Sequence, residues 1–142
     1  MSSIGASTDS AGPGGAKADV ELRIPADTAY VSVLRTTTAG LAARLDFSID
    51  DIEDLRIAVG EASAMVLPQA ADNSDLTCRF YLHAGELILS VGVVARGSVT
   101  PDYDSFAWQV LTTLATNATA DTSDGQFTIN LTMESGHPTV GL

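Results

Sequence analysis

Glu61 is the residue of this chain whose type and setting come nearest to those of a catalytic group. It is the one acidic residue in positions 58–65, where the other side chains are small or apolar. A carboxylate carried on a helix can serve as a general base. The helical period, however, places Glu61 about 100 to 120° from the centre of the apolar stripe, which favours a solvated side chain. The sequence therefore offers one candidate base and no visible catalytic partner for it.

Four neighbouring carboxylates could attract a divalent cation through their oxygen atoms. They are Asp50, Asp51, Glu53 and Asp54. Acidic side chains are also common in the first turn of a helix, where the helix dipole favours negative charge. We interpret this group as a solvated helix start and predict no metal site.

The remaining reactive residue types are too few or too isolated to form a site. His83 falls in an expected turn and His137 in a polar tail, so both are expected to be solvated. Cys78 is the one cysteine, which excludes an intramolecular disulfide and a cysteine-rich zinc site and fits a reducing, cytoplasmic setting. No glycine-rich phosphate-binding pattern occurs in the sequence.

The charge balance narrows the class of partner. The 142 residues include 7 Lys or Arg and 18 Asp or Glu, which gives a formal net charge of -11 at pH 7. A nucleic acid or an anionic membrane would meet net repulsion, so the sequence disfavours direct binding to either. An acidic surface suits a partner that is itself basic.

Length and hydrophobic content predict one globular core, since 45% of the residues are hydrophobic. Residues 1–17 are rich in Gly, Ser and Ala and lack aromatic residues, which predicts a disordered tail. The folded domain is expected over 18–135, followed by a C-terminal tail over 136–142. No run approaches 18 apolar residues and the N-terminus lacks a hydrophobic signal segment, so neither a transmembrane helix nor a secretory signal is predicted.

Alternation of apolar and polar residues marks the strands that would position these groups. It predicts a first strand over 20–24, a hairpin formed by 76–82 and 87–94, and a last strand over 126–133.

Apolar spacing and capping residues mark three helices. Asp27 is predicted to cap the first, whose buried stripe comprises Tyr30, Leu34, Leu41 and Leu45. Ser48 is the predicted N-cap of the second, which ends near Pro68, and the third runs from 104 or 105 to 116. The resulting order, β-α-α-β-β-α-β, predicts an α/β two-layer sandwich with a mixed, mostly antiparallel sheet covered on one face by helices.

Three segments in succession carry a family resemblance. They are Ile24-Pro25-Ala26, the run from Tyr30 to Arg35, and the run from Asp51 to Ala62. This succession resembles the RsbW/SpoIIAB anti-sigma factors, serine kinases of the GHKL ATPase superfamily, and implies a reduced GHKL (Bergerat-like) fold. Residues 105–115 look like the helix near the C-terminus of actinobacterial members.

The resemblance also implies a degenerate nucleotide site. Glu61 matches the general base of these kinases, but Met65 stands at the position of the asparagine that holds magnesium. A thioether is not a hard oxygen ligand, so this anchor is missing. Val93 and Ala95 replace the aspartate that reads adenine and a nearby glycine, and aromatic residues replace the glycine pair expected near 103–108. We therefore expect no bound cofactor, whether ATP or magnesium.

Partner contacts are assigned through the same resemblance. Arg35 matches the arginine with which family members touch both of their protein partners, and the neighbouring candidates are Thr36, Thr38, Ala39 and Arg44. An arginine fork can pair with a carboxylate across an interface. The alternative is a solvated arginine beside the buried stripe.

Three functions remain open at the level of sequence. The leading one is a cytoplasmic anti-sigma factor that sequesters an alternative, stress-type sigma factor and is released by a STAS-domain anti-anti-sigma antagonist. The second is an active ATP-dependent serine kinase of that antagonist, with Glu61 as base. The third is a pseudo-enzyme adaptor with an unrelated partner. A homodimer is a further implication of the resemblance.

Overall fold

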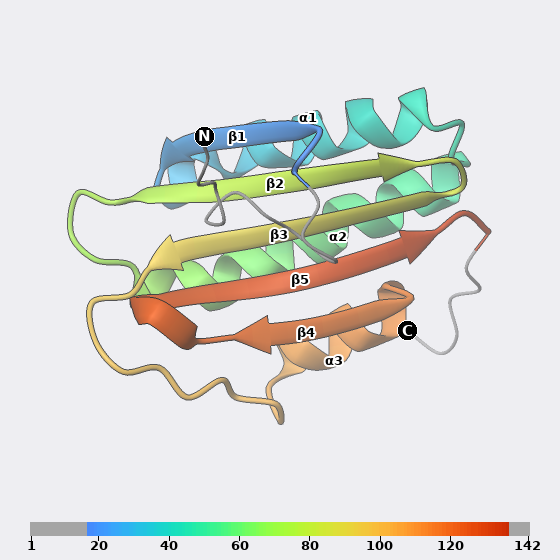
Figure 1. The fold of residues 1–142 in the computed structure, drawn as a ribbon. Coiled ribbons are helices and arrows are strands. Elements are labelled where there is room, and N and C mark those ends of the chain that lie inside the picture. The colour runs from blue at the N-terminus through green and yellow to red at the C-terminus, as the bar shows by residue number, and fades with distance from the viewer. Residues whose placement is uncertain (1–16, 137–142) are drawn as a thin grey trace.

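The molecule is a two-layer α/β sandwich in which helices cover one face of a sheet, as predicted (Figure 1). The computed structural model describes residues 17–136. The predicted tail over 1–17, apart from Lys17, lies outside this range, and so does His137 with the remainder of the predicted C-terminal tail.

The sheet has five strands in the order β1-β2-β3-β5-β4. Every junction between neighbouring strands is antiparallel, so the sheet contains no parallel pair among the described residues. The strands are β1 (Val20–Pro25), β2 (Asp75–His83), β3 (Glu86–Val94), β4 (Asn117–Asp121) and β5 (Gln126–Glu134).

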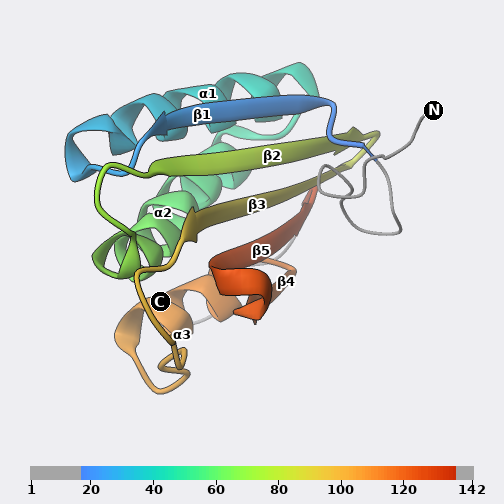
Figure 2. The same cartoon turned by 60° about the vertical axis from the view of Figure 1, so that its left-hand side comes forward.

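The predicted alternation explains how the sheet meets the helices. In β2 the side chains of Leu76, Cys78 and Phe80 are fully buried, and the intervening Thr77 and Arg79 lie half-buried on the other face. The apolar side chains of β3 and β5 that face the helices join the same core cluster. One face of the sheet thus packs on the helices, and no helix within residues 17–136 covers the other face, which is called the open face below (Figure 2).

Three α-helices form the second layer: α1 (Val31–Arg44), α2 (Ile49–Val66) and α3 (Phe106–Leu114). In Figures 1 and 2 α2 lies between the other two. The Ser48 hydroxyl accepts a hydrogen bond from the Asp51 amide at 3.1 Å, which confirms the predicted N-cap of α2. The α-helix ends at Val66, and Pro68 lies in the following 3-10 turn.

The start of the first helix differs from the prediction. Asp27 caps a short 3-10 turn, Thr28–Tyr30, through a 2.9 Å bond from the Ala29 amide, and α1 begins after it without a side-chain cap. Tyr30 is 42% exposed, so the buried stripe begins at Val31 instead. Leu34 is buried as predicted, whereas Leu41 and Leu45 are half-buried and the fully buried positions continue through Thr38 and Ala42.

Sequence patterning missed β4. Its residues, Asn117 to Asp121, include no large apolar side chain, and only the small residues Ala118 and Ala120 turn toward the core. The strand exists because it pairs with β5, from Asn117 opposite Thr132 to Asp121 opposite Thr128.

Candidate functional site

Arg35 lies where α1 and α2 meet, with its guanidinium against Gly60 of α2. A methyl group on Gly60 would lie 2.7 Å from Nη2, 3.0 Å from Nε and 3.3 Å from Cζ of Arg35. The side chain is half-buried, and within residues 17–136 no ion pair or hydrogen bond engages its guanidinium. The positively charged Arg35 guanidinium is therefore held at the junction of α1 and α2 with its hydrogen-bond donors unused.

The local sequence explains this placement. Leu34 and Val59 are fully buried and fix the inward faces of α1 and α2. The residue after each of them, Arg35 and Gly60, lies about 100° around its own helix and so at the edge of the contact. Because Gly60 has no side chain, the flat guanidinium can lie directly on the α2 backbone.

The residues predicted to accompany Arg35 do not share one environment. Thr36 and Arg44 are exposed and Ala39 is half-buried, so these three lie at the surface of α1. Thr38 is fully buried, and its hydroxyl donates a 2.8 Å hydrogen bond to the Leu34 carbonyl. The placement of Thr38 among surface residues was wrong, because it belongs to the buried stripe and not to the exposed side of α1.

Glu61 follows Gly60 in α2 and is half-buried. Within the described part of the chain it has neither an ion pair nor a side-chain hydrogen bond, and no group of three or more His, Cys, Asp or Glu residues is arranged to hold a metal.

Two of the positions that the resemblance assigns to nucleotide binding are occupied by core packing. Val93 is 2% exposed and belongs to the core cluster, and Met65 is half-buried against it. The Val93 side chain has no acceptor for an adenine amino group, and the Met65 thioether is not a hard-metal ligand.

The third position, Ala95, is tied down through its backbone. Its amide donates to the Gly125 carbonyl at 2.9 Å, and Ala95 forms an isolated β-bridge with Ala70. The Ala71 amide donates to the Val94 carbonyl at 2.8 Å. The segment after β3 is thereby fastened to the end of the helical layer and to the turn before β5.

Aromatic side chains occupy the start of α3, where the resemblance led us to expect a glycine pair. The rings of Tyr103 and Trp108 meet edge to face with centroids 5.1 Å apart and an interplanar angle of 73°. The Ser105 hydroxyl accepts a hydrogen bond from the Trp108 amide at 3.2 Å, so one amide of this helix start is used by its own cap. Phe106 projects outward and is 73% exposed.

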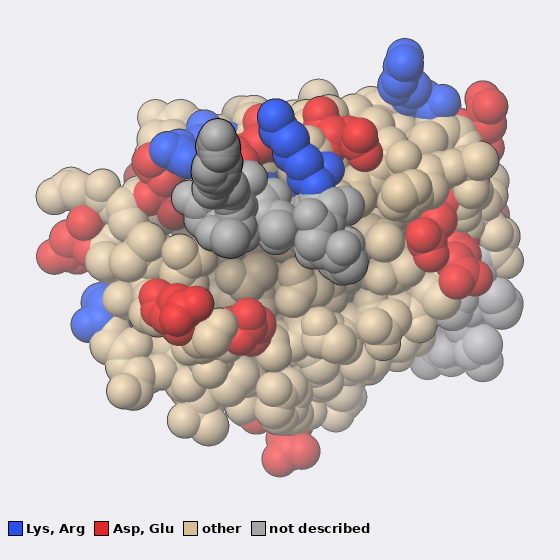
Figure 3. Space-filling view, viewed as in Figure 1, with Lys and Arg blue, Asp and Glu red and all other residues tan. Residues whose placement is uncertain are grey.

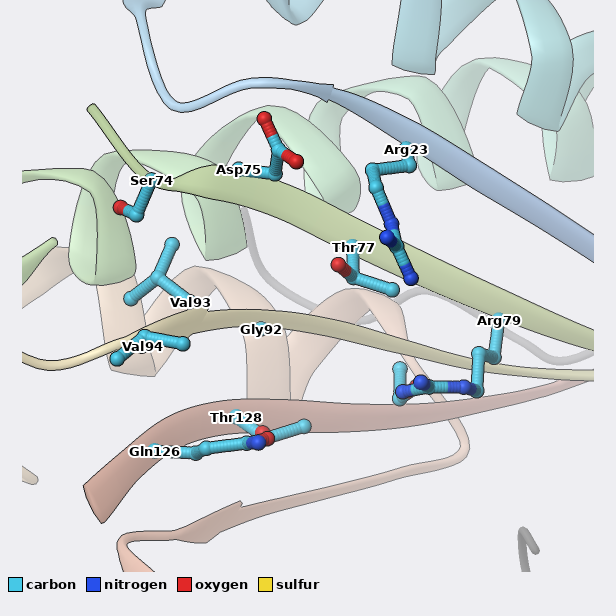
Figure 4. A pocket seen from close by; sticks show the side chains of 11 residues that line it. Arg23, Ser74, Asp75, Thr77, Arg79, Gly92, Val93, Val94, Gln126 and Thr128 are labelled. Atoms are coloured by element: carbon cyan, nitrogen blue, oxygen red, sulfur yellow. The ribbon is translucent and has the colours of Figure 1, made fainter. Parts of the chain in front are cut away.

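One cavity that sequence reasoning did not identify lies on the open face of the sheet. Figure 4 shows Arg23 and Arg79 reaching into it from β1 and β2. Both arginines pair with Glu21, at 3.4 and 3.2 Å. The lining residues are Arg23, Ser74, Asp75, Thr77, Arg79, Ser90, Gly92, Val93, Val94, Gln126 and Thr128. These residues come from different segments of the chain, so only the pairing register of the sheet reveals that they lie together.

A second cavity lies beside the segment that follows β3. It is lined by Ala95, Arg96, Gly97, Ser98, Val99, Thr122, Gly125 and Gln126. Glu61 and Met65 line neither of the two cavities. On the side of the molecule seen in Figure 3, Asp and Glu side chains are spread over the surface rather than gathered into one cluster.

Comparison with known proteins finds relatives named serine-protein kinase RsbW, although no family model matches the chain. Over 93 residues, or 64% of its length, the chain is 36% identical to "Serine-protein kinase RsbW" of Bacillus cereus strain ATCC 10987 and 34% identical to the protein of the same name in Bacillus thuringiensis strain Al Hakam. The matched region spans 56% of each relative.

A solved structure supports the fold. The crystal structure of the RsbU and RsbW domains of Rv1364c from Mycobacterium tuberculosis superimposes with a TM-score of 0.65 and 18% identity, covering 87% of this chain and 34% of that one. Together with the relatives, this confirms the resemblance that the sequence carries. None of the helices in residues 17–136 combines the length and apolar character that crossing a membrane requires.

Proposed function

We propose that this chain, an RsbW-type domain of the GHKL superfamily, is an anti-sigma factor that holds an alternative, stress-type sigma factor by protein contacts alone. The observation that carries the proposal is the Arg35 guanidinium, seated on Gly60 with its hydrogen-bond donors free. An arginine held in this way can pair with a carboxylate of a partner at little cost in side-chain entropy.

Neighbouring residues of α1 extend the proposed contact surface beyond Arg35. Thr36, Ala39 and Arg44 lie along the accessible side of α1 and complete the proposed contact surface, while Thr38 is left out because it is buried. The net charge of -11 adds long-range attraction to a basic partner, so association should slow as salt screens the charges.

Release is proposed to occur by competition. A STAS-domain anti-anti-sigma antagonist would bind the same surface of α1 and displace the sigma factor in the cytoplasm. The apolar and backbone packing at Met65, Val93 and Ala95 supports a mechanism that needs no nucleotide.

An active serine kinase is the second candidate, because the relatives are named serine-protein kinases and Glu61 stands at the position of the general base. Its two requirements are Mg·ATP binding and transfer of phosphate to a serine of the antagonist. A titration with nucleotide separates this candidate from the first.

The test of the proposal uses the purified full chain and the sigma factor encoded nearest to its gene. We expect a stoichiometric complex and loss of sigma-dependent transcription. Arg35→Ala should weaken binding by about 2 kcal/mol with an unchanged melting temperature. Arg23→Ala, on the open face of the sheet, is the matched control and should bind normally. Unchanged transcription at several-fold molar excess of the chain would contradict the proposal.

A further inference from the structure

The start of α3 forms an exposed aromatic corner of the molecule. Phe106 is 73% exposed and Tyr103, three residues earlier, is 54% exposed. In Figures 1 and 2 this corner lies on the far side of α2 from α1. It is therefore a separate surface from the one around Arg35, although both belong to the helical layer.

Local hydrogen bonds hold the corner in shape. The Asp102 carboxylate accepts from the Asp104 amide at 3.0 Å, and the Asp102 carbonyl accepts from the Ser105 hydroxyl at 2.8 Å. Tyr103 also packs its ring against that of Trp108. Because these interactions order the segment in the free protein, little conformational entropy remains to be lost on binding.

Charge indicates what the corner can bind. Asp102 and Asp104 are both exposed and flank Tyr103, and Phe106 follows two residues later. Burying the two aromatic side chains would contribute the apolar part of an interface, and aromatic residues are enriched at interface hot spots. The complementary surface is an apolar pocket bordered by Lys or Arg side chains.

We propose that this corner (Asp102, Tyr103, Asp104 and Phe106) is a second contact surface for the sigma factor. The inference rests on the proposed function. A sigma factor fits because a protein that binds DNA carries Lys- and Arg-rich surfaces, which meet the paired carboxylates. The sigma factor would then be held at both ends of the helical layer, by Arg35 on α1 and by Phe106 on α3.

The experiment compares single variants in a binding assay with the purified sigma factor. We expect Phe106→Ala to raise the dissociation constant about tenfold, on the scale of a truncated hot-spot residue. Val94→Ala removes part of another exposed apolar side chain, on the open face of the sheet, and should leave binding unchanged. The double change Asp102→Asn with Asp104→Asn should flatten the dependence of the dissociation constant on salt. Melting temperatures verify that each variant is folded.

The outcomes distinguish failure of the proposed anti-sigma function from failure of the second contact surface. If the wild-type chain does not bind the sigma factor, both the proposed function and this inference fail. If it binds and Phe106→Ala binds equally well, only the inference fails. An effect of Phe106→Ala confined to the STAS-domain antagonist, or to self-association of the chain in sedimentation, would assign the corner to a different occupant and overturn the inference.

Discussion

The guanidinium of Arg35 lies on Gly60, so closely that a methyl group at that position would come within 2.7 Å of Nη2. The two residues are on different helices and 25 positions apart in the chain. What meets the glycine is the far end of a flexible side chain, so a larger residue there would displace Arg35 instead of separating α1 from α2. The contact therefore links the identity of one small residue to the position of the proposed binding group.

Gly60→Ala should weaken binding to the sigma factor without lowering the stability of the chain. Alanine favours a helix interior over glycine by about 1 kcal/mol, so the free energy of unfolding should stay level or rise. The affinity for the sigma factor should fall roughly tenfold, because the new methyl group displaces the Arg35 guanidinium from its position against α2. Gly97→Ala, in the segment after β3, where a methyl group would also have open space around it, is the control and should leave binding unchanged. Equal binding by both variants would remove the role given to the Arg35 position.

Nucleotide binding should be too weak for a working kinase. Met65, Val93 and Ala95 each leave a polar group of the nucleotide or its metal without a partner, at a cost of about 1 to 3 kcal/mol apiece, which moves a micromolar site to about millimolar or weaker. Calorimetry with Mg·ATP should therefore give no signal in the micromolar range, and Glu61→Gln should bind the sigma factor normally. RsbW of Bacillus cereus serves as the comparison protein. Low-micromolar binding with radiolabel transferred to a serine of the antagonist would establish the kinase instead.

Asp51 should be important for stability. It is 5% exposed, and its Oδ2 accepts a hydrogen bond of 2.9 Å from the Gly136 amide, which ties the chain after β5 to the start of α2. Asp51→Ala leaves that amide without its partner and should lower the free energy of unfolding by about 1 to 3 kcal/mol. Asp50→Ala, in the same turn but exposed, should change it much less. Equal urea midpoints for the two variants would count against this role.

Cys78 should be inert in the folded protein. Burial raises the pKa of its thiol from 9.0 to about 12, against a smaller opposing effect of the Arg79 charge. A thiol reagent at pH 8 should react only after unfolding, since the thiolate is the nucleophile. Because the unfolded thiol ionises near pH 9, this residue should reduce stability as the pH rises from about 9 to about 12. Cys78→Ala should lack that contribution, and rapid labelling of the native chain would contradict the assignment.

The amino-acid sequence alone was enough to predict the elements whose side chains follow a regular period. Alternation identified the hairpin of β2 and β3 and the strand β5, and the Ser48 cap marked the start of α2. These signals are local, since a residue is assigned to a face by its neighbours within two to four positions. The family resemblance likewise depended on contiguous runs, above all the one from 51 to 62.

The features that depend on contacts between distant parts of the chain became visible only in the tertiary structure. β4 forms because β5 offers it a partner edge, and Thr38 is excluded from the surface by the core beneath it. Two further contacts also join segments that are distant in the chain. Arg35 packs on Gly60 of another helix, and Arg79 of β2 forms an ion pair with Glu21 of β1, as Arg23 also does. No local period encodes such interactions, because they are set by how helices and strands pack once each has formed.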